Sequence, residues 1–270
     1  MRSILLPVNN EEGLESRLQA ALDLGRATNG HISFLHGIAV SDYVALDPFG
    51  GSYFVAEQRE AALEEATRKQ TMLKAEMGNE DVAWDFLSVD GAPDDVLVAQ
   101  SRVADVEVLS EPSGDSDADL ASSVTYFVME AECPILAVPQ SSKAFNCAGK
   151  AVVAWNGSAP AANAMRAAIP LLQVANSVEV VTIGEDPKDF PAAKACAYLS
   201  RHGIKTELIR RERQDKVADE MHDLLLERSA DYMVMGAFSH SRLRETLFGG
   251  VSRHFIPVSY THLTLPTKIV

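Results

Sequence analysis

The residues best suited to chemistry lie between Gly236 and Ser252, in the segment GAFSHSRLRETLFGGVS. It follows a short apolar run at 232–235 that reads as a strand, and it leads into a run at 251–256 that reads as a helix. Glycine lets backbone N–H groups approach an anion closely, and those at the start of a helix point toward it. The chain carries a net charge of −14, yet this segment and the run that follows it hold one acid, Glu245, and five basic residues: His240, Arg242, Arg244, Arg253 and His254. The segment therefore predicts a phosphate-binding loop.

The sequence contains two similar halves, and this loop belongs to the second. Residues 3–9, SILLPVN, open the first half, and residues 151–156, AVVAWN, open the second. Further on, the segment ADVEVLS matches ADYMVMG, which aligns Asp105 with Asp231. Similarity over such a long period indicates two copies of a domain rather than a solenoid.

Strands and helices are expected to alternate in both halves. In the first half, apolar periodicity predicts helices at 14–28, 55–77, 94–102 and 126–132, with strands at 31–40, 82–89 and 134–138. The second half predicts helices at 191–202 and 216–228 and a strand at 204–209. The pair Asn29-Gly30 is a good end for the first helix. Such alternation implies a parallel sheet covered on both faces, with ligands beyond the carboxyl ends of its strands.

The glycine spacing of the loop resembles that of the universal stress protein family. Its nucleotide-binding members carry Gly, two residues, Gly, nine residues, then Gly followed by Ser or Thr. Here Gly236 opens the pattern, Ser239 takes the place of the second Gly, and Gly249 is followed by Gly250 in the Ser/Thr place. The resemblance covers about 1–139 and 151–256. It implies an α/β fold of two tandem doubly wound parallel-sheet domains, related to adenine nucleotide alpha-hydrolases and packed as a pseudo-dimer.

The resemblance also implies a ligand, ATP or AMP with magnesium, in the second half. In the family, an Asp at the end of the first strand contacts the adenine, and Asn9 and Asn156 take that place here. Asparagine can still form hydrogen bonds on two sides with a base edge. The implied nucleotide-binding residues are Ala154, Trp155, Asn156, Gly157, Met235, Gly236, Ser239, His240, Arg242, Gly249, Gly250, Val251 and Ser252.

The first half differs at the corresponding loop. The segment SEPSGDSDAD at 110–119 carries four acids and no base, which would repel a triphosphate, and Pro112 lacks a backbone donor. We therefore predict that the first half binds no nucleotide. Structural alternatives remain open for the second half, because Gly236 could serve a turn with positive φ and the Gly249-Gly250 pair could pack a helix closely onto the sheet. The basic residues could then form a solvated face.

Composition and charge narrow the function classes. The chain of 270 residues is 47% hydrophobic and 23% charged, which is typical of a globular protein. A pI near 4.9 argues against nucleic acids or an anionic membrane as the partner. No apolar run reaches about 18 residues, and the apolar run at the N-terminus is too short for a signal peptide, so we expect a cytoplasmic protein. No metal-ligand spacing or Ser-His-Asp grouping appears, and Cys133 and Cys196 are expected to be buried apolar residues.

The similarity of the halves also sets the expected domain limits. The first domain spans 1–139, a polar linker 140–150, and the second domain 151–257, which leaves a tail at 258–270. Residues 258–267, VSYTHLTLPT, equal the in-frame translation of a common transposase sequencing adapter, so we expect the tail to be non-native. It stands where the second half should have a last strand, and residues 260–265 have the β-propensity to pair there.

The sequence thus favours a stress-response factor whose state is set by bound ATP or AMP. It assigns no catalytic residue, so the chain is expected to hydrolyse ATP slowly at most. An interaction scaffold that binds no nucleotide and acts through its acidic surface is the alternative. An adenine-nucleotide hydrolase is less favoured, because that group's catalytic motif is missing. Expected assembly is the intramolecular pseudo-dimer, with a homodimer of whole chains as a further possibility.

Overall fold

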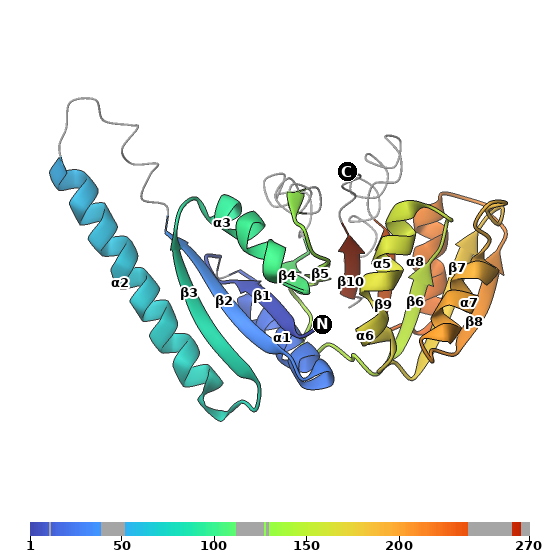
Figure 1. Ribbon diagram of the computed structural model, residues 1–270, viewed down its shortest axis with the longest axis horizontal. Helices are drawn as coiled ribbons and strands as arrows, with labels where there is room; N and C mark the ends of the chain where they lie inside the picture. Colours follow the sequence, from blue (N-terminus) through green and yellow to red (C-terminus); the bar gives the residue numbers. More distant parts are fainter. Residues whose placement is uncertain (11, 39–51, 112–126, 128–129, 237–260, 266–270) are drawn as a thin grey trace.

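The strands of the protein form one ten-stranded sheet. The computed structural model describes residues 1–10, 12–38, 52–111, 127, 130–236 and 261–265, with only the backbone for 52–58 and 261–265 (Figure 1). The strand order is β3-β2-β1-β4-β5-β10-β9-β6-β7-β8. The first half contributes β1 Ser3–Pro7, β2 His31–Ile38, β3 Ala83–Asp90, β4 Val106–Ser110 and β5 Ile135–Val138. The second half contributes β6 Lys150–Ala154, β7 Ser177–Ile183, β8 Thr206–Arg211, β9 Tyr232–Gly236 and β10 Thr261–Leu265.

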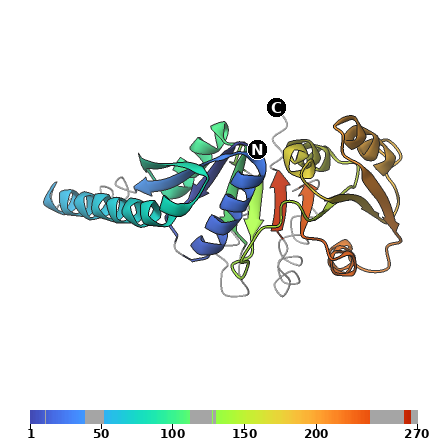
Figure 2. The same cartoon turned by 90° about the horizontal axis from the view of Figure 1, so that it is seen from below.

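The two halves have the same strand order and meet at one seam. Within each half, neighbouring strands are parallel. Across the seam, β5 pairs antiparallel with β10, and Figure 2 shows these two strands side by side in the middle of the molecule. The order in each half is that of a doubly wound fold. Successive strands are added on one side of β1 or β6, and the chain then crosses over to add the remaining strands on the other side. The predicted fold, two doubly wound halves packed as a pseudo-dimer, is confirmed.

Helices cover both faces of the sheet. They are α1 Leu14–Thr28, α2 Ser52–Glu76, α3 Pro93–Gln100, α5 Ala159–Ala167, α6 Ile169–Leu172, α7 Ala192–Arg201 and α8 Val217–Arg228, with 3-10 turns at Met77–Asn79 and Ser101–Val103. One core cluster joins α1, the end of α2, α5 and α7 to one face across both halves. The other face carries two separate clusters, under α3 in the first half and under α8 in the second. Alternate residues of each strand point to opposite faces, so each strand contributes side chains to the cores on both faces of the sheet.

Most predicted elements appear where the sequence placed them. The helix at 14–28 ends as expected, because Asn29 adopts a left-handed conformation with φ 52°; asparagine tolerates this region better than most residues. The helix α6 was not predicted. The expected helix at 251–256 lies outside the described residues, as do residues 126, 128 and 129 of the one expected at 126–132. Asp105 accepts the N–H groups of Arg2 and Ser3, and its aligned partner Asp231 accepts the N–H of Lys150 at 2.7 Å.

The predicted linker is partly exposed, but two of its side chains reach the core. Phe145 and Cys147 are both buried. The rings of Phe145 and Tyr232 pack edge to face, with their centroids 5.5 Å apart. The N–H of Phe145 donates to the Asp23 carboxylate at 2.8 Å. Because Asp23 lies on α1 and Tyr232 on β9, this segment ties the two halves together.

The last strand of the sheet comes from the tail. Strand β10 pairs parallel with β9, from Thr261 opposite Tyr232 to Leu265 opposite Gly236, and antiparallel with β5. The pairing expected for 260–265 is therefore present, and it completes the second half. The origin of the tail in a sequencing adapter stays a prediction.

Candidate functional site

The exit of β9 lies against the start of α5. A Cβ atom on Gly236 would stand 2.4 Å from the backbone nitrogen of Ala161 and 2.5 Å from the carbonyl carbon of Pro160. Only glycine fits such an approach without a shift of backbone. Gly236 is not among the described glycines with positive φ, so close packing, and not a left-handed turn, explains the residue. The contact brings the end of β9 to a helix N-terminus.

The turn between β6 and α5 is held by Asn156. Its Oδ1 accepts hydrogen bonds from the N–H and the hydroxyl of Ser158, at 3.1 and 2.6 Å. Ser158 in turn caps α5 by accepting from the N–H of Ala161 at 3.3 Å. Gly157 has φ +73°, and a Cβ there would meet the Pro187 ring at 2.7 Å. The structure thus brings Asn156, Gly157 and Gly236 to one place, the start of α5.

Other predicted site residues serve the core. Trp155 is buried, its indole N–H donates to the Phe190 carbonyl at 2.9 Å, and its own carbonyl accepts from the Thr182 hydroxyl at 3.2 Å. Ala154 and Met235 pack against the cluster under α8. The remaining predicted residues, which include every basic one, lie outside the described residues: Ser239, His240, Arg242, Gly249, Gly250, Val251 and Ser252.

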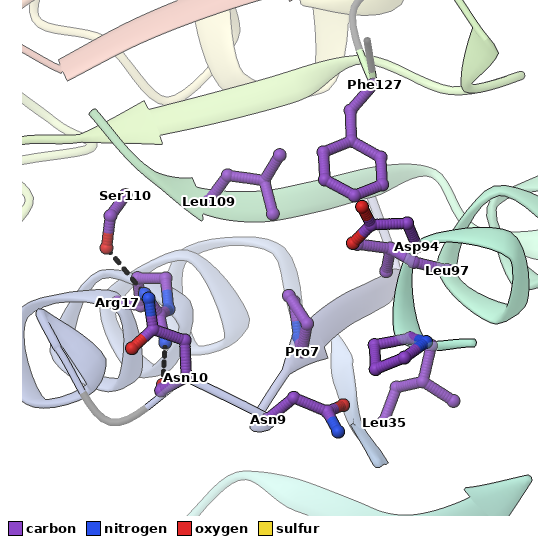
Figure 3. Close-up of a pocket in the computed structure, with 11 residues that line it drawn as sticks. Pro7, Asn9, Asn10, Arg17, Leu35, Asp94, Leu97, Leu109, Ser110 and Phe127 are labelled. Carbon is purple, nitrogen blue, oxygen red and sulfur yellow. Dashed lines mark hydrogen bonds between the residues drawn. The ribbon is translucent and has the colours of Figure 1, made fainter. Parts of the chain in front are cut away.

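A cavity of about 150 Å³ opens at the corresponding edge of the first half (Figure 3). It lies beyond the carboxyl ends of β1, β2 and β4, where strand order reverses, which is the usual ligand position in such sheets. Its walls are formed by Pro7, Asn9, Asn10, Arg17, Leu35, Pro93, Asp94, Leu97, Leu109, Ser110 and Phe127.

Asn9, in the place of the family's adenine-contacting Asp, is engaged within the protein. Its Nδ2 donates to the Gly37 carbonyl at 2.7 Å, and its Oδ1 accepts from the Gly37 N–H at 2.9 Å. The backbone carbonyl of Asn9 accepts from the buried ammonium of Lys69 at 3.0 Å. Both sides of the Asn9 amide are therefore occupied at the end of β1.

Arg17 is the cavity residue that sequence reasoning missed. It is buried on α1, and its guanidinium donates to the carbonyls of Asn10 and Glu12 and to the Ser110 hydroxyl. Burial lowers the pKa of Arg17 to about 10. The sequence does hold a signal, because Arg17 falls three residues after Leu14 and four before Ala21, on the apolar stripe of the helix.

Titratable groups that could hold a metal are not clustered in the described part of the chain. Among those residues there is no group of three or more His, Cys, Asp or Glu with suitable placement. Cys133 is buried, as predicted, whereas Cys196 is only partly buried. None of the helices described here is long and apolar enough to cross a bilayer.

Comparisons with known proteins agree with this architecture. A universal stress protein from Archaeoglobus fulgidus superposes with a TM-score of 0.69 at 13% identity, covering 98% of this chain and 96% of that one. A putative universal stress protein from Pseudomonas aeruginosa gives a TM-score of 0.58 at 16% identity, covering 98% and 93%. At such identities the likeness shows the fold. A search of curated proteins found no match. The model of the universal stress protein family matches residues 1–139, and the chain therefore belongs to the universal stress protein family.

Proposed function

We propose that this chain is a stress-response factor whose second half, a second copy of the family domain, binds an adenine nucleotide. The observation that carries the proposal is the close contact between Gly236 and the start of α5. The basic segment that begins at Gly236 therefore leaves the sheet beside a helix N-terminus. Unpaired N–H groups and the helix dipole favour anions at that position.

The chemistry of the segment after Gly236 supports a phosphate ligand. Its basic side chains, Arg242 among them, reverse the sign of a strongly acidic chain. Its glycine pattern resembles that of the family's nucleotide-binding members, which favours ATP or AMP, with magnesium as counter-ion to the phosphates. The residues proposed to contact the nucleotide are those named from the sequence, with Trp155 contributing no side-chain contact because its indole lies in the core.

The first half is proposed to bind no nucleotide. Asn9 has its amide bonded to Gly37 on both sides, so a base edge would have to displace that pairing. The loop after β4 carries four acids and no base. The acidic chain is also a poor partner for nucleic acids or anionic membranes, and we propose that it acts in the cytoplasm.

Retention of nucleotide by the purified chain tests this proposal. The full chain is incubated with ATP and magnesium, passed through a desalting column and denatured, and the released nucleotides are separated and quantified. We expect close to one nucleotide per chain, because one half carries the loop. The variant Gly249→Val, which alters the glycine pattern, should lose it. Gly78→Val serves as the matched control, because a Cβ at Gly78 meets no atom within 4 Å.

The other outcomes separate the alternatives. Absence of nucleotide from the wild-type chain would overturn the proposal in favour of an interaction scaffold that acts through the acidic surface. Retention by Gly249→Val equal to that of the wild type would remove the ligand from this loop. Multiple turnovers of ATP to ADP or AMP would instead favour a hydrolase.

A further inference from the structure

Arg17 is a buried cation that has no carboxylate partner among the residues the structure describes. Its side chain is 4% exposed. Its guanidinium donates to the Glu12 carbonyl at 2.9 Å, to the Asn10 carbonyl at 2.7 Å and to the Ser110 hydroxyl at 2.5 Å. All three acceptors are uncharged. In the described part of the chain, no carboxylate forms an ion pair with Arg17, and its Nε has no hydrogen-bond partner. A buried charge of this kind favours an anion beside it.

The cavity that Arg17 lines has two chemically different ends. Figure 3 shows Arg17 with Ser110 and Asn10 at one end and Asp94 at the other. The wall between them is apolar, formed by Pro7, Leu35, Leu97, Leu109 and Phe127. An anion at the Arg17 end would therefore carry an apolar body that runs along this wall toward Asp94.

We propose that this cavity binds a small monocarboxylate whose apolar body is about the size of a benzene ring. A cavity of about 150 Å³ lined by apolar side chains accommodates benzene. Arg17 donates both N–H groups of Nη1 and one of Nη2 within the protein, which leaves the second Nη2 N–H for a ligand carboxylate. A charge-assisted hydrogen bond of this kind is stronger than a neutral one. The Ser110 hydroxyl accepts from Arg17 and can donate its own hydrogen to the same carboxylate.

The shape and charge of the cavity select against other anions. The cavity holds only part of a nucleotide, and inorganic phosphate would leave the apolar wall uncovered. Partial burial, followed by the nearby charge of Asp95, raises the pKa of Asp94. This end of the cavity therefore disfavours negative charge, so a ligand with a second carboxylate there would bind less well than a monocarboxylate. The proposal concerns the first half and does not depend on nucleotide binding in the second.

Fluorine NMR on the full chain provides the test. The probe is 4-fluorobenzoate, with 4-fluorobenzyl alcohol as a neutral analogue of the same size. We expect saturable binding of the acid and at least a tenfold weaker response to the alcohol. The variant Arg17→Met should lower the affinity for 4-fluorobenzoate on the order of 10- to 100-fold, which corresponds to the loss of a hydrogen bond to a charged group. Arg201→Met, at an exposed arginine of α7, controls for the change in net charge.

Two further variants keep the test decisive. Leu97→Phe adds volume to the apolar wall without touching Arg17, and it should abolish binding in a chain that is still folded at the temperature of the NMR measurement. If Arg17→Met does not fold, Ser110→Ala keeps the cation and should still lower the affinity for 4-fluorobenzoate. Four results would each overturn the proposal. The first two are equal binding of the acid and the alcohol, and no binding of the acid at about 10 mM. The others are an affinity for the acid that is unchanged in Leu97→Phe and in the Arg17 or Ser110 variant, and displacement of the acid by stoichiometric AMP.

Discussion

The side-chain amide of Asn9 closes on the backbone of Gly37 through two hydrogen bonds, one donated at 2.7 Å and one accepted at 2.9 Å. These bonds join the ends of β1 and β2 across the pocket edge. Asn156 holds the same sequence position in the second half, but its Oδ1 accepts from Ser158 in its own turn. The same residue type therefore fixes a strand pair in one half and a helix start in the other.

This difference predicts that the same substitution, Asn to Asp, destabilises the protein at one position and leaves its stability nearly unchanged at the other. Asn9→Asp removes the donor to the Gly37 carbonyl and places a carboxylate against it, so we expect a loss of about 1–3 kcal/mol in the free energy of unfolding. Asn156→Asp keeps both acceptor bonds to Ser158, and its effect should stay within about 0.5 kcal/mol. Urea unfolding of both variants measures the contrast. Equal losses would show that the Gly37 pairing does not matter.

Gly236 gives a second prediction, on packing. In Gly236→Ala, the new methyl group collides with the backbone at the start of α5, and relief requires the helix to move. We expect a loss of about 1–3 kcal/mol in unfolding free energy, as for other overpacked sites. Gly78→Ala, where no atom lies within 4 Å, provides the control and should be close to neutral. Wild-type stability in Gly236→Ala would mean that the helix start is free to shift.

The sequence predicted the fold well because its signals are local. The strand runs, the apolar stripe of α1 and the left-handed Asn29 are each encoded within a few neighbouring residues. The missed features depend on contacts between distant residues. Asn9 and Gly37 are 28 positions apart and meet only through the register of β1 and β2. Phe145 is buried because Tyr232 lies across the seam, and Arg17 acquires its role from Ser110 on β4.

Glu107 predicts a dependence of stability on pH. It is fully buried on β4 between Leu5 and Ile135 of the neighbouring strands, and neither carboxyl oxygen has a hydrogen-bond partner among the described residues. Burial raises the pKa of Glu107 to about 8 from 4.5. Between these values the folded chain holds a proton that the unfolded chain has lost, so stability falls as pH rises from about 4.5 to 8. Each pKa unit corresponds to about 1.4 kcal/mol.

Unfolding by urea at pH 5 and pH 8 tests this sign. Glu107→Gln removes the titration, so its stability relative to the wild type should improve by a few kcal/mol between pH 5 and pH 8. Glu64→Gln, on the exposed face of α2, controls for the change in net charge. A constant difference between Glu107→Gln and wild type across the range would contradict the assignment.

The seam gives a prediction about assembly. Deletion of residues 261–270 removes β10 and exposes the edges of β5 and β9. Unpaired edges favour pairing with another chain, so we expect the shortened protein to form dimers or larger species. Sedimentation velocity at several concentrations detects them, and deletion of 266–270 alone, which leaves β10 in place, is the control. A shortened chain that stays monomeric at high concentration would show that β10 does not protect the seam.

Calorimetric titration of ATP into the full chain, with and without magnesium, tests the central claim most directly. We predict one binding site per chain that disappears in Gly249→Val and remains in Gly78→Val and Asn9→Asp. That result would place an adenine nucleotide at the loop of the second half. No heat of binding together with an unchanged melting temperature would contradict nucleotide binding, and full affinity in Gly249→Val would contradict its location.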